Sequence, residues 1–313
     1  MIVKGIGVTT RIDKHNCIIA KEALEDAVKD INEGLYAIGV GIEHDSTIMP
    51  IGKVISGKMV KLDDGEYGIE IEQELFDKYQ VFSDDTGEKW YIAKSQRDIR
   101  PFADTQAEDI HNIKVSIDPV NFSKTDCEKL IDFYKKECLF DTEYFMRKSV
   151  IPDPEIIFTL VAGTIAAMTG KKITEHITDD IVKLYELIKK AVLKTVKCCR
   201  QSYRPITYVI KENTSYLMEL VVVTEIPDIL FEALQNEKLS QIEAKIETFT
   251  NNFNVDIAKV QCLYNIEGQE WIVNYVSTRD GKVIGSEKCY KKTVELARKI
   301  GTELPDRHTD DIT

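Results

Sequence analysis

Apolar and polar positions alternate with a period of two over much of the first third of the chain. This pattern, together with short apolar runs, predicts strands over residues 2–8, 36–44, 51–62, 67–76 and 112–122. Asp63, Asp64 and Gly65 predict a hairpin turn. Residues 18–32 instead have apolar side chains at helical spacing, and Gly34 ends this predicted helix. The polar stretch 83–107 predicts a loop or flap, so this part is expected to be mainly β.

The pattern changes after residue 122. Ser123 and Thr125 can cap a helix that begins there, and the apolar stretch 156–170 predicts a buried helix. Further helices are predicted over 179–200, 228–250 and 290–300, with paired strands over 205–224 and three strands between 258 and 288. We therefore expect an α+β protein with a mainly β domain over residues 1–122 and an α+β layer domain over 123–313.

The charge balance bears on the choice of partner. The 313-residue chain has 41 basic and 53 acidic residues, a net charge of −12, which argues against a mainly electrostatic nucleic-acid binder. Lysines and an arginine gather locally at Lys189, Lys190, Lys194, Lys197 and Arg200. A solvated helix face is the simpler interpretation of this run, so nucleic acid is not an expected partner.

Cysteine usage and hydropathy bear on location. The seven cysteines are odd in number and form no C-x-x-C, which favours neither a disulfide framework nor a zinc site. Free thiols in a reducing cytoplasm are the plain interpretation. The N-terminal residues lack the apolar core of a signal peptide, and residues 156–170 are too few to span a bilayer. We expect a cytoplasmic protein without membrane, metal or cofactor.

One of the five histidines stands out. His44 ends an apolar strand and is followed by Asp45, a position where an imidazole facing a cleft can act as a general base. A structural role is the simpler interpretation of such a histidine taken alone. The alternating Glu70, Glu72 and Glu74 predict a solvent-exposed strand face.

The context of His44 carries a resemblance. Residues 42–76, IEHDSTIMPIGKVISGKMVKLDDGEYGIEIEQELF, resemble the central segment of phage prohead (head-maturation) proteases and their prophage relatives. In that family an apolar strand ends in His-Asp, a short loop leads to Pro-Ile-Gly, and an acidic-Gly hairpin joins the next two strands. Residues 11–31 resemble the family's opening. The resemblance covers about residues 2–122 and implies the protease fold shared with herpesvirus assemblins.

The resemblance also implies a serine nucleophile on a later strand. Residues 113–122 are similar to the family's apolar-Ser-apolar strand, which makes Ser116 the candidate nucleophile and His44 its base. The third catalytic group varies between histidine and an acid in the family, and His111 and Asp118 are both available. Ser56 is a rival serine. Asp118 also departs from the small residues expected after the nucleophile.

Two functions follow as hypotheses. The first is a serine protease of the prohead type that acts on phage structural precursors or on itself. The alternative is a catalytically inactive protease-like fold that serves as an interaction or sensor protein in a prophage or phage-defence system. A protein substrate or phage structural protein is the expected partner, and homo-oligomerisation is left open. Residues 123–313 have no catalytic signature; Trp271 and Tyr275 there predict a buried sheet face.

Overall fold

A computed structural model of the whole chain describes residues 1–12, 18–34, 38–42, 45–84, 86–102, 111–144, 154–169, 175–199, 205–299 and 308–309. Backbone contacts divide the chain into two compact units, each described here by itself. Unit 1 comprises Met1–Thr105, Val255–Lys259 and Asn274–Thr313. Unit 2 comprises Gln106–Asn254 and Val260–Val273. Unit 2 therefore occupies the middle of the chain, and unit 1 contains residues from both sides of it.

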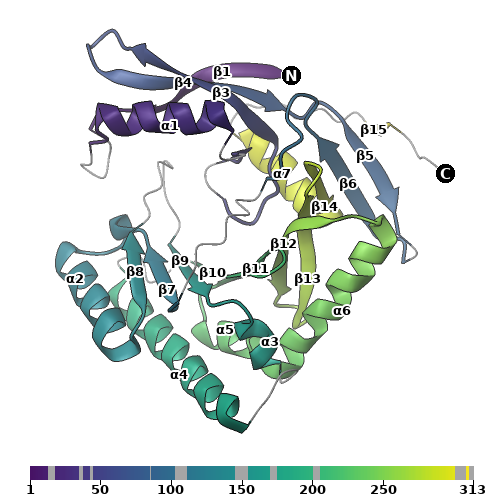
Figure 1. Cartoon of the computed structure of the whole chain (residues 1–313). Helices are drawn as coiled ribbons and strands as arrows, with labels where there is room; N and C mark the ends of the chain where they lie inside the picture. The colour runs from purple at the N-terminus through teal and green to yellow at the C-terminus, as the bar shows by residue number, and fades with distance from the viewer. Residues whose placement is uncertain are drawn as a thin grey trace. The chain divides into compact units, whose positions relative to one another are not determined.

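Unit 1 begins with a four-stranded antiparallel sheet and one helix. The strands are β1 (Ile2–Thr9), β2 (Gly39–Val40), β3 (Gly52–Lys61) and β4 (Tyr67–Leu75), in the order β1-β4-β3-β2. Helix α1 (Lys21–Glu33) packs on β3 and β4 through the buried Leu24 and Ile31 (Figure 1). The side chain of Asn32 exchanges two hydrogen bonds with the backbone of Gly57 and fixes the helix to β3. The predicted helix, its end at Gly34 and the β3–β4 hairpin are confirmed.

A second sheet of unit 1 combines both ends of the chain. Its strand order is β15 (His308–Thr309), β5 (Tyr79–Ser83), β6 (Lys89–Lys94), β14 (Lys282–Ser286) and the end of β13 (Glu270–Thr278), with α7 (Glu287–Lys299) following β14. Tyr290 of α7 stacks on Tyr91 with ring centroids 3.9 Å apart and meets the edge of Tyr79 at 4.9 Å. The prediction of a loop over 83–107 was wrong at β6, where the buried Trp90 and Tyr91 pair with the neighbouring β5 on one side and with the distant β14 on the other.

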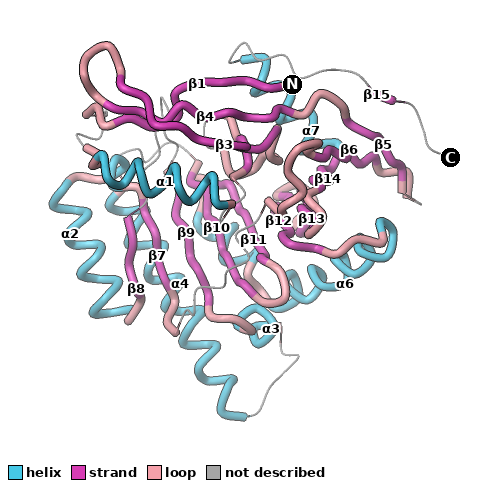
Figure 2. Tube along the Cα trace, turned by 45° about the horizontal axis from the view of Figure 1, so that its top comes forward, coloured by secondary structure: helices cyan, strands magenta, loops and turns pink. Residues whose placement is uncertain are grey.

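Unit 2 is built on a mixed sheet. Its strands are β7 (Lys114–Ile117), β8 (Asp141–Tyr144), β9 (Glu155–Leu160), β10 (Ile206–Asn213), β11 (Leu217–Thr224) and parts of β12 (Ile257–Asn265) and β13. The order is β13-β12-β11-β10-β9-β7-β8, with β9 parallel to β10 and β7 parallel to β8. In Figure 2, strands β8, β7, β9, β10 and β11 run side by side in this order.

Helices complete unit 2. They are the 3-10 turn η1 (Pro119–Asn121), α2 (Lys124–Phe133) with its π-helical end η2 (Tyr134–Cys138), α3 (Thr164–Met168), α4 (Glu175–Cys198), α5 (Pro227–Ala233) and α6 (Asn236–Phe253). Helix α4 contacts α2, α3 and α5. Ser123 caps α2 as predicted, because its hydroxyl accepts a hydrogen bond from the backbone N–H of Asp126.

The predicted buried helix over 156–170 was wrong in its first half. Residues 155–160 form β9, which pairs with β10 on one side and β7 on the other. A strand between two others is apolar on both faces, so its pattern does not distinguish it from a buried helix. The chain becomes helical only after Gly163, which has a φ of 88° that favours glycine. The α+β class is confirmed. Among the described helices, none combines the length and the apolar character that crossing a membrane requires.

Candidate functional site

The predicted nucleophile Ser116 lies on β7 of unit 2. This strand is not at an edge: β8 pairs with it on one side, placing Glu143 opposite Ser116, and β9 pairs on the other, placing Ile157 opposite. The Ser116 side chain is only 5% exposed. A peptide substrate therefore cannot pair with β7 without displacing one of its neighbours.

The Ser116 hydroxyl has a partner within the sheet. It donates a hydrogen bond to Oε2 of Glu143 over 3.3 Å. The same carboxylate oxygen lies 3.1 Å from the Nζ of Lys114, which shares the face of β7 with Ser116. Ser116 thus belongs to a small network in which a lysine, a carboxylate and a hydroxyl contact one another. Ordinary glutamates have a pKa of about 4.3, so a carboxylate is a weaker base towards serine than an imidazole.

Asp118 comes directly after β7 and before the turn η1. It is 1% exposed. Glu155, the first residue of β9, is 4% exposed. Sequence reasoning missed Glu143, because its contact with Ser116 depends on the pairing of β7 with β8.

The two predicted histidines have different outcomes. His44 lies outside the described residues, so its pairing with Ser116 stays a prediction. His111 is described and exposed, three residues before β7 begins. The rival Ser56 is half-buried on β3 of unit 1, beside a shift in the pairing with β4.

Asp45, which follows His44, is held by unit 1 itself. Its carboxylate accepts hydrogen bonds from the backbone and hydroxyl of Thr47 at 2.8 and 2.6 Å and lies 2.9 Å from the Nζ of Lys292 on α7. Burial opposes ionisation of Asp45, but the Thr47 and Lys292 contacts outweigh it and lower its pKa. The contacts of this carboxylate fix the loop before β3 to α7.

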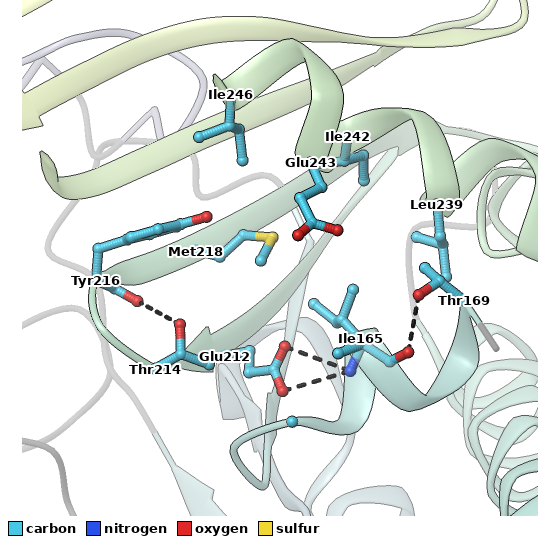
Figure 3. Close-up of a pocket in the computed structure, with 12 residues that line it drawn as sticks. Ile165, Thr169, Glu212, Thr214, Tyr216, Met218, Leu239, Ile242, Glu243 and Ile246 are labelled. Carbon is cyan, nitrogen blue, oxygen red and sulfur yellow. Dashed lines mark hydrogen bonds between the residues drawn. The ribbon is translucent and has the colours of Figure 1, made fainter. Parts of the chain in front are cut away.

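A cavity of about 180 Å³ lies in unit 2 between α3, the turn that joins β10 to β11, and α6. Figure 3 shows two carboxylates pointing into it, Glu212 from β10 and Glu243 from α6, with the ring of Tyr216 at one side. The walls are mostly apolar and include Ile165 and Ile242. The sequence analysis did not identify this cavity.

The Glu212 carboxylate is 1% exposed, and both of its oxygens lie 3.3 Å from the backbone nitrogen of Ile165. Burial raises the pKa of Glu212, although backbone N–H groups at the start of α3 act in the opposite direction. Burial also raises the pKa of Tyr216, and nearby acidic groups that include Glu243 and Glu212 raise it further. A signal was present in the sequence: Glu212 continues the apolar face formed by Ile206, Tyr208 and Ile210.

The remaining candidates are structural. Glu70 and Glu72 are half-exposed as predicted, but Glu74 is 6% exposed, which the prediction of a solvent face missed. Trp271 is fully buried and donates to the carbonyl of Ala233 over 2.9 Å, which confirms a core role. Within the described ranges, no three histidine, cysteine, aspartate or glutamate residues are grouped so that they could hold a metal ion.

The basic run lies on α4 as a helix face. The ammonium groups of Lys189 and Lys194 lie 5.4 and 5.8 Å from the ring centres of Phe231 and Phe133. Lys190 and Lys197 are exposed, and Arg200 is outside the described residues. These contacts fit lysines whose stems cover apolar rings while their charges stay in water.

No protein-family model, curated protein or solved structure matches this chain. Two parts of unit 2 therefore bear on function: the surroundings of Ser116 on β7 and the cavity beside α3. On β7, the Ser116 hydroxyl contacts the Glu143 carboxylate, which also contacts Lys114. The cavity is lined by two carboxylates, of which Glu212 contacts the backbone nitrogen of Ile165.

Proposed function

We propose that this chain is an interaction or sensor protein in which Ser116 has a structural role. The observation that carries the proposal is the state of the Ser116 hydroxyl: it is 5% exposed and donates to Glu143 within a strand that is paired on both sides. A nucleophilic serine requires a base that accepts its proton and an open approach for the acyl group. The described contact of the Ser116 hydroxyl is with a carboxylate, and pairing on both sides of β7 closes the approach along the strand.

Labelling with a fluorophosphonate probe tests the proposal. We expect no adduct on Ser116 in the native full-length protein, read by mass spectrometry of the digested chain. Ser56→Ala is a matched control, because Ser56 is a serine on an internal strand of the other unit. An adduct that disappears in Ser116→Ala but persists in Ser56→Ala would overturn the structural role.

A serine protease of the prohead type is the second candidate. One observation favours it: the buried Asp118 follows Ser116 two residues later, directly after β7. The resemblance of residues 42–76 to prohead proteases supplies His44 as the expected base. In this proposal the substrates are phage structural precursors or the chain itself.

Time-dependent cleavage of the purified chain, or of a phage scaffold protein, separates the two proposals. If the protease proposal holds, Ser116→Ala abolishes cleavage, and His44→Ala slows it by about 10²–10⁴-fold, the usual contribution of a general base. Glu143→Gln tests whether the carboxylate takes part. If cleavage is undetectable in wild type, or equal in wild type and Ser116→Ala, Ser116 is not the nucleophile.

A further inference from the structure

Strand β1 of unit 1 is an open edge. It is the terminal strand in the order β1-β4-β3-β2, and in Figure 2 strand β4 separates it from β3. Within the described part of the chain, no strand pairs with its other side. An open edge has a row of unpaired backbone N–H and C=O groups, and another extended chain can pair with them.

The pairing with β4 shows which groups of β1 point outward. The Met1 nitrogen donates to the carbonyl of Leu75, and the Leu75 N–H donates to the carbonyl of Met1, each over 2.8 Å. Hydrogen-bonded pairs alternate with non-hydrogen-bonded pairs in an antiparallel ladder, so Val3 and Gly5 also bond to β4. The residues between them direct their N–H and C=O groups away from β4; they are Ile2, Lys4 and Ile6.

The side chains of this edge are mostly apolar and exposed. Ile2, Val3 and Ile6 are 37%, 36% and 48% exposed. Natural edge strands are usually protected from other strands by charges, prolines or bulges. In β1 the single lysine is Lys4, proline is absent, and the pairing with β4 shifts only after Ile6. Residues 2–6 therefore form a regular stretch that matches the usual length of a strand.

Lys4 determines which charge a partner strand should have. Its side chain is 60% exposed, and its Nζ lies 3.2 Å from the Glu72 carboxylate on β4. An ammonium group has three donors, so Lys4 can contact a second carboxylate on its outer side. Opposite charges directly across two strands stabilise the pairing, and like charges destabilise it. The edge therefore favours a strand with an acidic residue opposite Lys4.

A second copy of β1 fits this edge less well. A twofold pairing that places Ile2 opposite Ile6 of the other copy also places Lys4 opposite Lys4, so like charges meet at its centre. A register shifted by two residues instead places an isoleucine opposite Lys4 and leaves the other isoleucine without a partner. The charge pattern thus favours a different chain over a second copy.

We infer that residues 2–6 bind an extended peptide of a partner protein as an added antiparallel strand, with apolar side chains opposite Ile2 and Ile6 and an acidic side chain opposite Lys4. Antiparallel pairing continues the pattern of the other strands in this sheet. Main-chain hydrogen bonds supply affinity in strand addition, and side-chain pairs supply specificity. Because β1 lies in unit 1 and Ser116 in unit 2, the inference holds whether Ser116 is structural or catalytic.

A short peptide of alternating pattern is the probe: Thr-Val-Thr-Glu-Thr-Val-Thr, capped at both ends and labelled with a fluorophore. Fluorescence anisotropy measures its binding to the untagged full-length protein at pH 7 and low salt. We expect a dissociation constant below about 1 mM, and binding at least about fivefold weaker when the glutamate is replaced by lysine. Absence of binding, or equal binding of the two peptides, would overturn the inference.

Backbone methylation of the probe separates strand addition from contact through side chains alone. In the inferred pairing the N–H of the glutamate points towards β1, because this residue lies opposite Lys4, whereas the N–H of the following threonine points away. N-methylation of the glutamate should therefore weaken binding at least about tenfold, and N-methylation of that threonine less than about threefold. Equal effects of the two methyl groups would contradict strand addition.

Matched substitutions place the peptide on β1. Ile6→Ser removes an apolar side chain of the edge and should weaken binding about three- to fivefold. Ile99→Ser removes an exposed isoleucine elsewhere in unit 1 and should change affinity less than about twofold. Lys4→Gln should reduce the preference for the glutamate peptide over the lysine peptide to less than about twofold. Circular dichroism checks that each variant is folded. Equal effects of the two serine variants, or an unchanged preference in Lys4→Gln, would place the peptide elsewhere and overturn the inference.

Sedimentation velocity tests the alternative occupant. We expect Ile6→Ser to leave the sedimentation coefficient of the full-length protein unchanged. A wild-type dimer that becomes a monomer in Ile6→Ser would show that a second copy occupies β1, and this result would overturn the assignment to a partner peptide.

Discussion

Each of the two units contains a glutamate that is almost completely buried, and the two behave in opposite ways. Glu74 on β4 of unit 1 is 6% exposed and has a lowered pKa, whereas Glu212 on β10 of unit 2 is 1% exposed and has a raised pKa. Burial disfavours the charge in both. The difference must therefore lie in what each carboxylate contacts.

The Glu74 carboxylate is enclosed by hydrogen-bond donors. It accepts from the Ser95 hydroxyl at 2.5 Å and from the backbone N–H groups of Gln96 and Arg97 at 2.9 and 3.1 Å. The buried Lys53 lies opposite it in the β3–β4 pairing. Together these contacts outweigh burial and keep Glu74 ionised.

The contacts of Glu212 are longer and come from backbone N–H groups at the start of α3. Its closest donor is the backbone N–H of Ile165 at 3.3 Å, and its other side faces the cavity. The comparison indicates that a buried carboxylate with short, numerous contacts holds a fold together. One that is held only by longer backbone contacts keeps a raised pKa.

The largest expected effect is the loss of Glu74. Glu74→Ala leaves the Ser95 hydroxyl and two backbone N–H groups without their acceptor. We expect the free energy of unfolding to fall by about 3–4 kcal/mol in urea denaturation. Glu70→Ala, on the same strand but half-exposed, is the control and should cost less than about 0.5 kcal/mol. Equal losses would contradict the structural role of Glu74.

Lys53 gives the second effect, a dependence of stability on pH. Its side chain is fully buried, and its Nζ donates to the carbonyls of Asp98 and Arg100. Burial lowers its pKa from 10.5 to about 8. Between these pH values the unfolded chain holds more protons than the folded one, so this group makes the free energy of unfolding rise with pH. The full rise is on the order of 3 kcal/mol.

Buried thiols change the free energy of unfolding with pH in the opposite direction. Their contribution must therefore be separated from that of Lys53. Burial raises the pKa of Cys262 and of Cys289 to about 12, so stability falls with pH as these thiols ionise in the unfolded chain. Urea denaturation of wild type and Lys53→Met at pH 7.5 and 10.5 isolates the lysine. We expect the stability of wild type relative to the variant to increase at the higher pH. A difference that does not change with pH would contradict the role of Lys53.

Matched amide substitutions give a smaller effect and test the comparison directly. Glu74→Gln keeps one acceptor but loses the charge that its donors favour, so it should cost about 2 kcal/mol. Glu212→Gln should change stability by less than about 1 kcal/mol, since the amide oxygen can still accept from Ile165 and the charge is already disfavoured. Both are measured by urea denaturation. A larger loss at Glu212 than at Glu74 would reverse the interpretation of the two sites.

The smallest effect is expected at Ser116. Ser116→Ala removes a single hydrogen bond of 3.3 Å, and Glu143 keeps its contact with Lys114. We expect a loss of at most about 1 kcal/mol in the same assay. A loss as large as that of Glu74→Ala would show that the network on β7 contributes far more to the fold than its geometry indicates.

The sequence predicted those elements whose pattern is local. Helix α1 has an apolar stripe and a terminal glycine, and the β3–β4 hairpin has alternating strands around an acidic-Gly turn, so both followed from neighbouring residues. Strand β6 did not, because its partners are β5 and the distant β14. Strand β9 was taken for a helix, because an internal strand is apolar on both faces.

The residues of the candidate site also differ in whether the sequence alone could predict them. Ser116 was predicted from the resemblance to prohead proteases, whereas Glu143 comes beside it only through the pairing of β7 with β8. The burial of Glu74 depends on the loop 95–97 folding back over β4, which no local pattern shows. In contrast, the Glu212 carboxylate at the end of an apolar strand face was visible in the sequence.

The stacking of Tyr91 on Tyr290 has a practical consequence for dissecting the chain. Tyr91 precedes unit 2 in the sequence and Tyr290 follows it. Tyr79 also packs on Tyr290. An expression fragment that stops at residue 122 lacks Tyr290, so the apolar ring surfaces of Tyr79 and Tyr91 would be exposed to solvent. Such a fragment would be prone to aggregate. A minimal version of unit 1 needs the segment from Asn274 onward, so the piece to excise is the middle of the gene.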